Sequence, residues 1–504
     1  MRGALPIVAS PRRFFDPRPA TPSLLGLSQA LGRLERHRPA GLLVEILPVA
    51  IGWATAHAIH ARLRALRDRG MRVVAWLPQG GGTKELYLAA AASEAYLATG
   101  APLWAAGLRV ESSFLGRAFE RFGLRAQIEA TGDHKSAGDR FTRSEMSDAD
   151  RQQLSRILDV TWERVVGDIA DGRKKTAEEV RAFFDAAPQG TADAVAAGLF
   201  DAVLHEDELH AKLSPRGRPR LVALGALVAR RPLLVPLWRR RRIAVVPIVG
   251  PIVPAGALPA WASGASGATA DAVVSALRAA ARDRSVVGVV LAIDSPGGSA
   301  TASEAIHREV VRVREKKPVV ASMGDVAASG GYYVAVAAET IFASRVTITG
   351  SIGVVGGKIA IGGLLEKLGV HREMLTRGAR AALLSPSRAW TDDDRAAFRR
   401  QLERTYDEFV GRVADGRKKS PEEVRSIAGG RVWVGADALA NGLVDREGDL
   451  GAAIDLLREK VGRTVDVVAW AGPSSPPPPL PAAAAILATE RIALFAALDA
   501  SIEG

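Results

Sequence analysis

The stretch TWERVVGDIADGRKKTAEEVR at Thr161–Arg181 recurs, little changed, as TYDEFVGRVADGRKKSPEEVR at Thr405–Arg425. In both halves an Ala-Asp-Ala triplet and then a Gly-Leu pair follow at the same spacing. Solenoid proteins repeat every 20 to 50 residues or so, which is far shorter than the separation here. The sequence therefore predicts one fold written twice in tandem, at residues 38–213 and 243–460.

Each predicted copy alternates short apolar runs with amphipathic segments. In the second copy GVVLAID (288–294) is a β-branched run, residues 302–317 have apolar side chains at helical spacing, and PVVASM (318–323) follows. Residues 41–77 of the first copy keep the same order. Strands that alternate with crossover helices pair in parallel, so we expect an α/β fold.

Composition and charge narrow the class of protein. The 504 residues are 48% hydrophobic and 24% charged, which is typical of a globular chain and excludes a disordered or fibrous one. With no cysteine, disulfides, thiolate metal sites and a cysteine nucleophile are all excluded. The net charge of +12 invites a nucleic-acid or anionic-membrane partner. Because no helix-turn-helix or ladder of aromatic and basic residues accompanies it, we expect no nucleic-acid partner.

The remaining segments flank and join the copies. We interpret 1–37 as an N-terminal extension, 214–242 as an Arg-rich linker, and 461–504 as a tail with a Pro-rich segment, SSPPPPLP. The N-terminus has no apolar run of signal-peptide length, and no run of about 20 apolar residues offers a membrane span. These features predict a cytoplasmic or peripheral membrane location. The linker, with Trp238 among its arginines, is either a solvated connector or an interfacial segment.

A glycine pair follows the strand predicted at 288–294 in the second copy. DSPGGS (294–299) carries Gly297 and Gly298, whereas the first copy has no such pair at the corresponding place. Without a Cβ in the way, backbone N–H groups there can approach an oxyanion or a phosphate. A tight turn is the alternative explanation.

A serine among small residues lies about thirty positions further on. In GDVAASGGYY (324–333), Ser329 stands between a predicted strand and an apolar helix that begins near Gly330. This is similar to a nucleophile elbow, and a helix N-terminus favours negative charge beside the serine. The alternative is an N-cap serine. Lys84 takes the corresponding position in the first copy, so only the second copy can use a serine there.

A serine nucleophile needs a base. None of the eight histidines has the context of a catalytic triad, and His57 and His60 are more consistent with a helix face than with metal ligands. Asp325 and Glu339 are candidates, but a carboxylate of low pKa is a poor base for an alcohol. A lysine has to be neutral, so burial has to lower its pKa from about 10.4 towards about 7 or 8.

DSPGGS and GDVAASGGYY together resemble the signal peptide peptidase A (protease IV) family in its long, two-repeat form, over about residues 40–460. The resemblance implies two tandem Clp/crotonase-like repeats, each a ββα superhelix. It also implies a serine peptidase with a Ser–Lys dyad: Ser329 in the AASGG segment, and Lys135 in GDHKSA (132–137) of the first copy. Because the second copy has alanine or arginine in place of Lys135, each copy would keep one half of the dyad.

The same resemblance implies further roles. The Gly330 amide and one from Gly297 or Gly298 would form the oxyanion hole, and Ser351 would position the lysine amine. Substrates would be apolar peptides, including signal-peptide remnants, cut by an endopeptidase through an acyl-enzyme. Members form homo-oligomers around an inward-facing chamber, with a tetramer expected, and no metal, nucleotide or other cofactor is implied.

Two other functions remain open from the sequence. A crotonase-like acyl-CoA enzyme would use the glycine amides to hold a thioester enolate and would leave Ser329 as a helix cap. A non-catalytic, membrane-associated scaffold would use neither Ser329 nor Lys135.

Overall fold

The computed structural model describes residues 5–8, 23–37, 39–188, 190–214, 217, 219, 221–224, 241–254, 267–462 and 465–470. Most of the predicted linker 214–242 and of the predicted tail 461–504 lies outside these residues. Within the described ranges, no helix has both the length and the apolar character that crossing a bilayer requires.

The first repeat contains a small parallel sheet. α1 (Leu24–His37) belongs to the predicted N-terminal extension. The elements of the repeat are β1 (Leu42–Glu45), α2 (Trp53–Asp68), β2 (Val73–Leu77), β3 (Gly81–Gly82), α3 (Thr83–Ala90), β4 (Glu94–Ala98), β5 (Leu103–Trp104), α4 (Gly116–Phe122), β6 (Arg125–Ala130), the 3-10 turn η1 (Ser136–Gly138), α5 (Asp139–Thr142), α6 (Asp148–Arg173), α7 (Ala177–Asp185), α8 (Thr191–Ala196), β7 (Ala202–Leu204) and α9 (Glu206–Leu213). The sheet order is β1-β2-β4-β7, with every pair parallel. Every residue of β2 is buried, as expected for a strand covered on both faces.

The second repeat has a larger sheet, whose pairs are parallel except for β14 with β16. Its elements are β8 (Arg242–Val249), β9 (Ile252–Val253), β10 (Ala268–Thr269), α12 (Ala270–Arg282), β11 (Val286–Ser295), α13 (Ala300–Arg314), β12 (Val319–Ala328), α14 (Gly330–Ala335), β13 (Thr340–Ala343), β14 (Ile348–Gly350), β15 (Val355–Ala360), α15 (Gly362–Lys367), α16 (Asp392–Arg417), α17 (Pro421–Ile427), β16 (Val432–Val434), α18 (Gly435–Ala440), β17 (Arg446–Glu447), α19 (Leu450–Val461) and β18 (Asp466–Ala469). The sheet order is β16-β14-β12-β11-β8-β18, with β13 between β12 and β17. β18, from the start of the predicted tail, pairs in parallel with β8.

The duplicated stretch forms matching structures in both repeats. It belongs to α6 and α7 in the first and to α16 and α17 in the second, and α6 and α16 are each 26 residues long. Both long helices end at a lysine in the left-handed conformation, Lys174 at φ 55° and Lys418 at φ 53°. A capping box then starts the next helix, at Thr176 and at Ser420. These matches confirm an α/β fold present twice.

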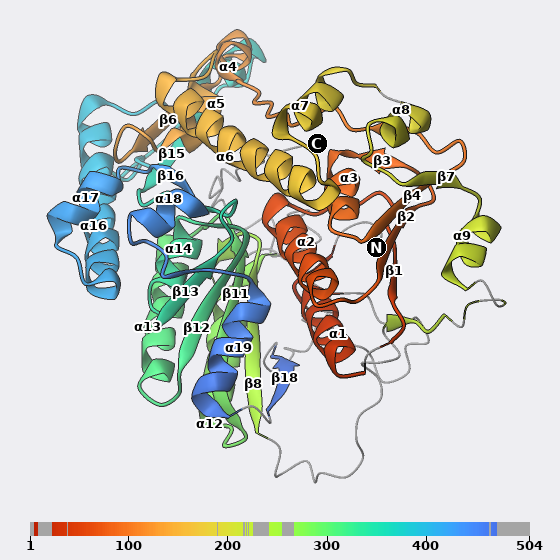
Figure 1. Ribbon diagram of the computed structural model, residues 1–504. Helices are drawn as coiled ribbons and strands as arrows, with labels where there is room; N and C mark the ends of the chain where they lie inside the picture. The colour runs from red at the N-terminus through yellow and green to blue at the C-terminus, as the bar shows by residue number, and fades with distance from the viewer. Residues whose placement is uncertain are drawn as a thin grey trace, which may run out of the picture.

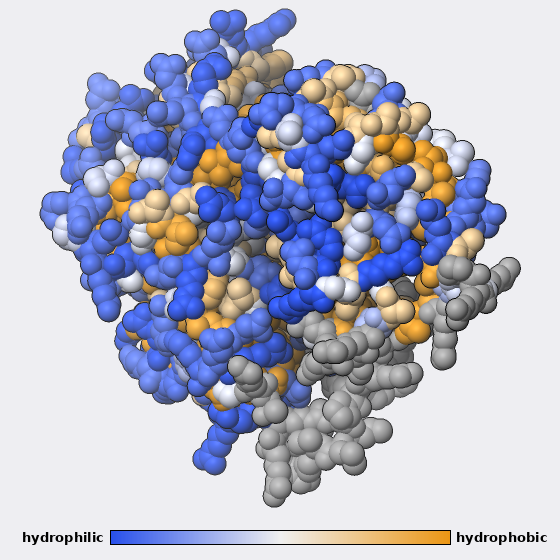
Figure 2. Space-filling view, in the orientation of Figure 1, coloured by the Kyte–Doolittle hydropathy of each residue, from blue (hydrophilic) through white to orange (hydrophobic). Residues whose placement is uncertain are grey.

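Strand pairing and hydrogen bonds between elements of the two repeats join them. β6 of the first repeat pairs antiparallel with β15 of the second, and Figure 1 shows this ribbon where the repeats meet, near α5. Elsewhere, the Asp325 carboxylate accepts hydrogen bonds from the N–H and hydroxyl of Thr55, near the start of α2, both at 2.8 Å. The face of the molecule in Figure 2 is mainly hydrophilic, with apolar side chains scattered over it, as is usual for globular proteins.

Candidate active site

Ser329 lies in a strained turn between β12 and α14. Its φ of 52° and ψ of −117° are unusual for a residue with a side chain, and such strain is found most often at functional sites. The turn packs tightly, because a Cβ on Gly331 would be 2.7 Å from the Ser295 carbonyl oxygen. The Ser329 side chain makes no capping hydrogen bond to α14. Within the described residues, the N-cap alternative therefore does not explain this serine.

The structure brings Lys135 to Ser329 across the repeat boundary. Lys135 Nζ lies 3.1 Å from Ser329 Oγ, 2.8 Å from Ser351 Oγ and 2.9 Å from the Ser351 carbonyl oxygen. Only 8% of Lys135 is exposed, and burial lowers the pKa of its amine to about 7. A neutral amine has two N–H groups and one lone pair. The two oxygens of Ser351 can take the N–H groups, which leaves the lone pair for the Ser329 hydroxyl.

Backbone from the second repeat supports the loop that carries Lys135. The His134 N–H donates to the Gly429 carbonyl oxygen at 3.1 Å. Gly430 has φ of 80°, and a Cβ there would be 2.4 Å from the Lys135 Cβ. Only a glycine fits against the lysine backbone at this distance. We did not single out the Gly429–Gly430 pair from the sequence, although a glycine pair one residue before an apolar segment is a visible signal.

The glycine pair of DSPGGS lies beside the serine. A Cβ on Gly297 would be 2.6 Å from the Gly330 nitrogen and 2.8 Å from the Ser329 Cβ. The Gly297 N–H donates to Ser295 Oγ at 3.1 Å. The Gly298 N–H and the Gly330 N–H are therefore the donors best available to a ligand at Ser329. β9 fixes the pair, because the Ile252 N–H donates to the Gly297 carbonyl oxygen at 2.8 Å.

Ser351 also has a conformation that is rare for a residue with a side chain. Its φ is 50°, and its N–H donates to the Arg431 carbonyl oxygen at 2.8 Å. β14 precedes it and pairs with β12 at the strand end that leads into Ser329. One ladder of strands thus fixes both Ser329 and the serine that contacts the Lys135 amine.

A cavity with mainly apolar walls opens beside Ser329 and Lys135, and both repeats line it. Ile128 and Phe141 come from the first repeat, while Tyr333, Val354 and Phe409 come from the second. The paired strands β6 and β15 form part of its wall. The cavity therefore exists only when the two repeats are together.

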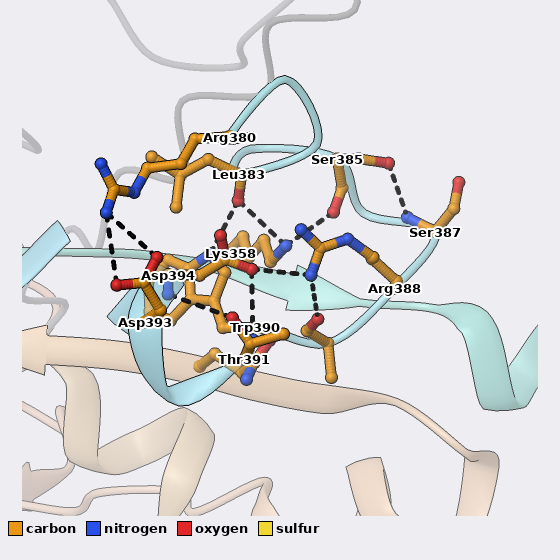
Figure 3. A network of polar contacts seen from close by, with 12 residues as sticks. Lys358, Arg380, Leu383, Ser385, Ser387, Arg388, Trp390, Thr391, Asp393 and Asp394 are labelled. Carbon is orange, nitrogen blue, oxygen red and sulfur yellow. Dashed lines mark hydrogen bonds and ion pairs between the residues drawn. The ribbon is translucent and has the colours of Figure 1, made fainter. Parts of the chain in front are cut away.

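Lys358, a second buried lysine, borders the same cavity. It lies on β15 and is 7% exposed, and burial lowers the pKa of its amine. Its Nζ donates to the carbonyl oxygens of Leu383 at 3.0 Å and Ser385 at 2.8 Å, and it lies 5.6 Å from the centre of the Trp390 ring. Figure 3 shows this amine directed into the loop before α16. Lys358 thus fixes that loop on β15, a role that no sequence pattern indicated.

The other candidates from the sequence lie elsewhere. His57 and His60 are buried in the packed face of α2, where His57 Nδ1 lies 3.0 Å from Ser344 Oγ and His60 stacks on Tyr87. Burial lowers the pKa of His60 to about 3. No cluster of three metal-binding side chains occurs among the residues described.

Neither candidate carboxylate serves as the partner of the serine hydroxyl. Asp325 binds the start of α2, as described above. Glu339 accepts from Lys460 Nζ at 3.0 Å. In the first repeat, Lys84, the counterpart of Ser329, lies 5.3 Å from the centre of the Trp53 ring.

Family models match both repeats. The model described as Peptidase family S49 matches residues 65–216 and 312–464, and the model described as Clp protease matches residues 262–360. The range matched by the Clp protease model, 262–360, contains both DSPGGS and GDVAASGGYY. A Clp-like fold, as expected from the sequence, is thereby confirmed.

Known proteins resemble most of the chain. Serine protease SPPA, chloroplastic, of Arabidopsis thaliana is 32% identical over 457 residues, which are 87% of this chain and 66% of that protein. Protease 4 of Haemophilus influenzae is 31% identical over 437 residues, which are 82% of this chain and 68% of that protein. The chain thus spans about two thirds of the length of these relatives. The family expected from the sequence is confirmed, and the chain belongs to peptidase family S49, a family of serine peptidases.

Proposed function

We propose that the protein is an endopeptidase that cleaves apolar peptides through an acyl-enzyme on Ser329, with Lys135 as the general base. The observation that carries this proposal is the 3.1 Å approach of Lys135 Nζ to Ser329 Oγ, in a site where burial lowers the lysine pKa to about 7. A buried, neutral amine within hydrogen-bond reach of a serine hydroxyl meets the requirement for activating that nucleophile.

The reaction proceeds in two stages. Ser329 Oγ attacks the scissile carbonyl carbon while Lys135 Nζ takes the hydroxyl proton, and a tetrahedral oxyanion forms. Lys135 then gives this proton to the leaving amine as the C–N bond breaks, which leaves the acyl group on Ser329. Water then attacks the ester while the same amine takes its proton. Lys135 returns this proton to Ser329 Oγ as the ester C–O bond breaks and the second product leaves.

Backbone amides stabilise the charge that develops on the carbonyl oxygen. Gly330 N–H and Gly298 N–H are the proposed oxyanion donors, since Ser295 already takes the N–H of Gly297. Ser351 positions the Lys135 amine through its two oxygen atoms. A fixed amine loses less freedom when the transition state forms.

The walls of the cavity support an apolar substrate. Ile128, Phe141 and Phe409 offer side chains that would bury apolar residues of a peptide. Remnants of signal peptides are peptides of this kind, and we propose them as substrates. Assembly into a homo-oligomer, a tetramer, and peripheral membrane contact through residues 214–242 complete the proposal.

The Ser329 side chain distinguishes this function from its alternatives. An acyl-CoA enzyme would use the amides and leave the serine as a cap, but Ser329 makes no capping bond and contacts a buried lysine. A scaffold would have no use for a lysine whose amine is buried and whose pKa burial lowers to about 7. Both observations favour the peptidase.

The test is hydrolysis of an apolar peptide, together with labelling by a fluorophosphonate, in the wild type and in Ser329→Ala. We expect the wild type to cleave the peptide and to gain one label at Ser329, and we expect the variant to do neither. Cleavage that persists in Ser329→Ala would show that this serine is not the nucleophile.

A further inference from the structure

We infer that Gln153 is a positioning residue that fixes the Lys135 loop to the strand beside Ser351. This inference rests on the proposed function, since it concerns how the Ser–Lys pair is aligned. Gln153 belongs to α6 of the first repeat and is only 4% exposed. It contacts neither Ser329 nor the cavity, so it would act through other residues.

Both ends of the Gln153 amide are hydrogen bonded, each to a different repeat. Nε2 donates to the His134 carbonyl oxygen at 3.3 Å, and Oε1 accepts from the Val432 N–H at 2.7 Å. A carbonyl needs a donor and an N–H needs an acceptor, so the two partners determine the orientation of the amide.

Each partner is next to a group that the dyad needs. His134 is joined to Lys135 by the peptide bond whose carbonyl Gln153 holds. Val432 lies on β16 opposite Gly350 of β14, and Ser351 follows directly. The Gln153 amide therefore links the backbone beside Lys135 to β16. β16 pairs with β14, which leads into Ser351, the residue that positions the Lys135 amine.

The two repeats differ at this position. Gln153 on α6 corresponds to Ala397 on α16, in helices of equal length that begin with similar sequences. The amide is present in the repeat that carries the lysine and absent from the other. Gln152, next to it, is exposed and offers a matched control.

Docking of α6 on the second repeat has other support. One turn further along, Arg156 makes two hydrogen bonds to Asp437 of α18, at 2.9 and 2.7 Å. This exposed pair holds the same helix and does not touch the Lys135 loop. Arg156→Ala therefore controls for a general loosening of the contact between the repeats.

The experiment compares Gln153→Met and Gln153→Glu with Gln152→Ala and Arg156→Ala in the full-length protein. Met keeps the bulk and removes both hydrogen bonds, and Glu keeps only the acceptor for Val432. We expect both Gln153 variants to lower kcat by about 10- to 100-fold with KM changed less than about threefold, as loss of alignment predicts. The acidic limb of kcat/KM should move upward by about half a pH unit or more, because a loosened amine is better hydrated.

The controls separate the outcomes. Gln152→Ala and Arg156→Ala should keep the kcat and the pH profile of the wild type, and thermal melting should show all four variants folded. A Gln153→Met enzyme with the wild-type kcat and profile would overturn the inference. The inference would also be overturned if both Gln153 variants failed to fold while the two controls folded, because Gln153 would then support the whole fold. Peptide cleavage by Ser329→Ala would instead refute the proposed function.

Discussion

The first repeat and the second repeat share a fold, but they hold different halves of the site. The first supplies Lys135 on the loop after β6, and the second supplies Ser329, Ser351 and the glycine pair of DSPGGS. At the place of Ser329 the first repeat has Lys84, which lies over the Trp53 ring. A duplicated fold can thus divide one site between its copies, provided that the contact between them is tight.

That contact is built from backbone as much as from side chains. Gly430 packs closely against the Lys135 backbone, and β6 pairs with β15 along six residues of each strand. Since the lysine amine is buried by this contact, the same surface that joins the repeats also lowers the lysine pKa. Changes at the part of the boundary that contacts Lys135 should therefore affect catalysis more than equal changes elsewhere in either repeat.

The largest effect on activity should come from replacing Lys135 of the first repeat. Lys135→Met should lower kcat/KM at least about 1,000-fold, because the serine loses its base. Lys84→Met, the matched change at the position equivalent to Ser329, should stay within about threefold of the wild type. Steady-state hydrolysis of an apolar peptide measures both, and similar losses in the two variants would contradict the division of roles.

A methyl group at the boundary should produce the next largest effect. Gly430→Ala places a Cβ 2.4 Å from the Lys135 Cβ and should lower kcat about 10- to 100-fold, because the lysine loop has to move. Gly369→Ala is the control, since Gly369 also has positive φ, at 70°, but no atom lies within 4 Å of the added Cβ. If both variants lost kcat equally, backbone strain rather than contact with Lys135 would be the cause.

Removal of the Ser351 hydroxyl should have a smaller effect. Ser351→Ala keeps the carbonyl oxygen at 2.9 Å from Lys135 Nζ but loses Oγ at 2.8 Å, so we expect kcat to fall about 5- to 50-fold with little change in KM. Ser387→Ala, on the loop before α16, should leave kcat unchanged. Equal kcat for Ser351→Ala and the wild type would remove the positioning role from Ser351.

The smallest effect on catalysis should come from the other buried lysine. Lys358→Met should keep kcat/KM within about threefold and lower the free energy of unfolding by about 1 to 3 kcal/mol, because the Ser385 carbonyl loses its Lys358 donor and the Leu383 carbonyl keeps only the one from Trp390 Nε1. Chemical denaturation and peptide hydrolysis measure the two quantities. A loss of activity as large as that of Lys135→Met, in a folded protein, would show that burial alone does not distinguish the base.

The sequence was sufficient for the features that local patterns encode. The repeated TWERVVGDIADGRKK stretch predicted the duplication. DSPGGS and GDVAASGGYY indicated the family, and the resemblance to that family indicated Lys135. The residues alone left Ser329 between a nucleophile and a cap, because both readings require a small-residue turn before a helix. The absence of a capping bond and the contact with Lys135 Nζ favour the nucleophile.

The features that we did not predict depend on contacts between distant segments. Gly430 is required to be glycine by Lys135, almost 300 positions earlier in the chain, and the buried Gln153 accepts a hydrogen bond from Val432 in the other repeat. In the sequence Lys358 is an ordinary lysine. Its contacts with the Leu383 and Ser385 carbonyls in the loop before α16 are visible only in the structure. No periodicity or local motif records such pairings.

The central claim is that Lys135 is neutral at the pH of catalysis and activates Ser329 across the boundary between the repeats. The most direct test is the rate at which a fluorophosphonate labels Ser329, measured from about pH 5 to pH 10. Since only the neutral amine accepts a proton, the rate should rise with pH, reach half its maximum near the lysine pKa of about 7, and then level off. A midpoint near the ordinary lysine pKa of about 10.4, or an unchanged profile in Lys135→Met, would contradict the account.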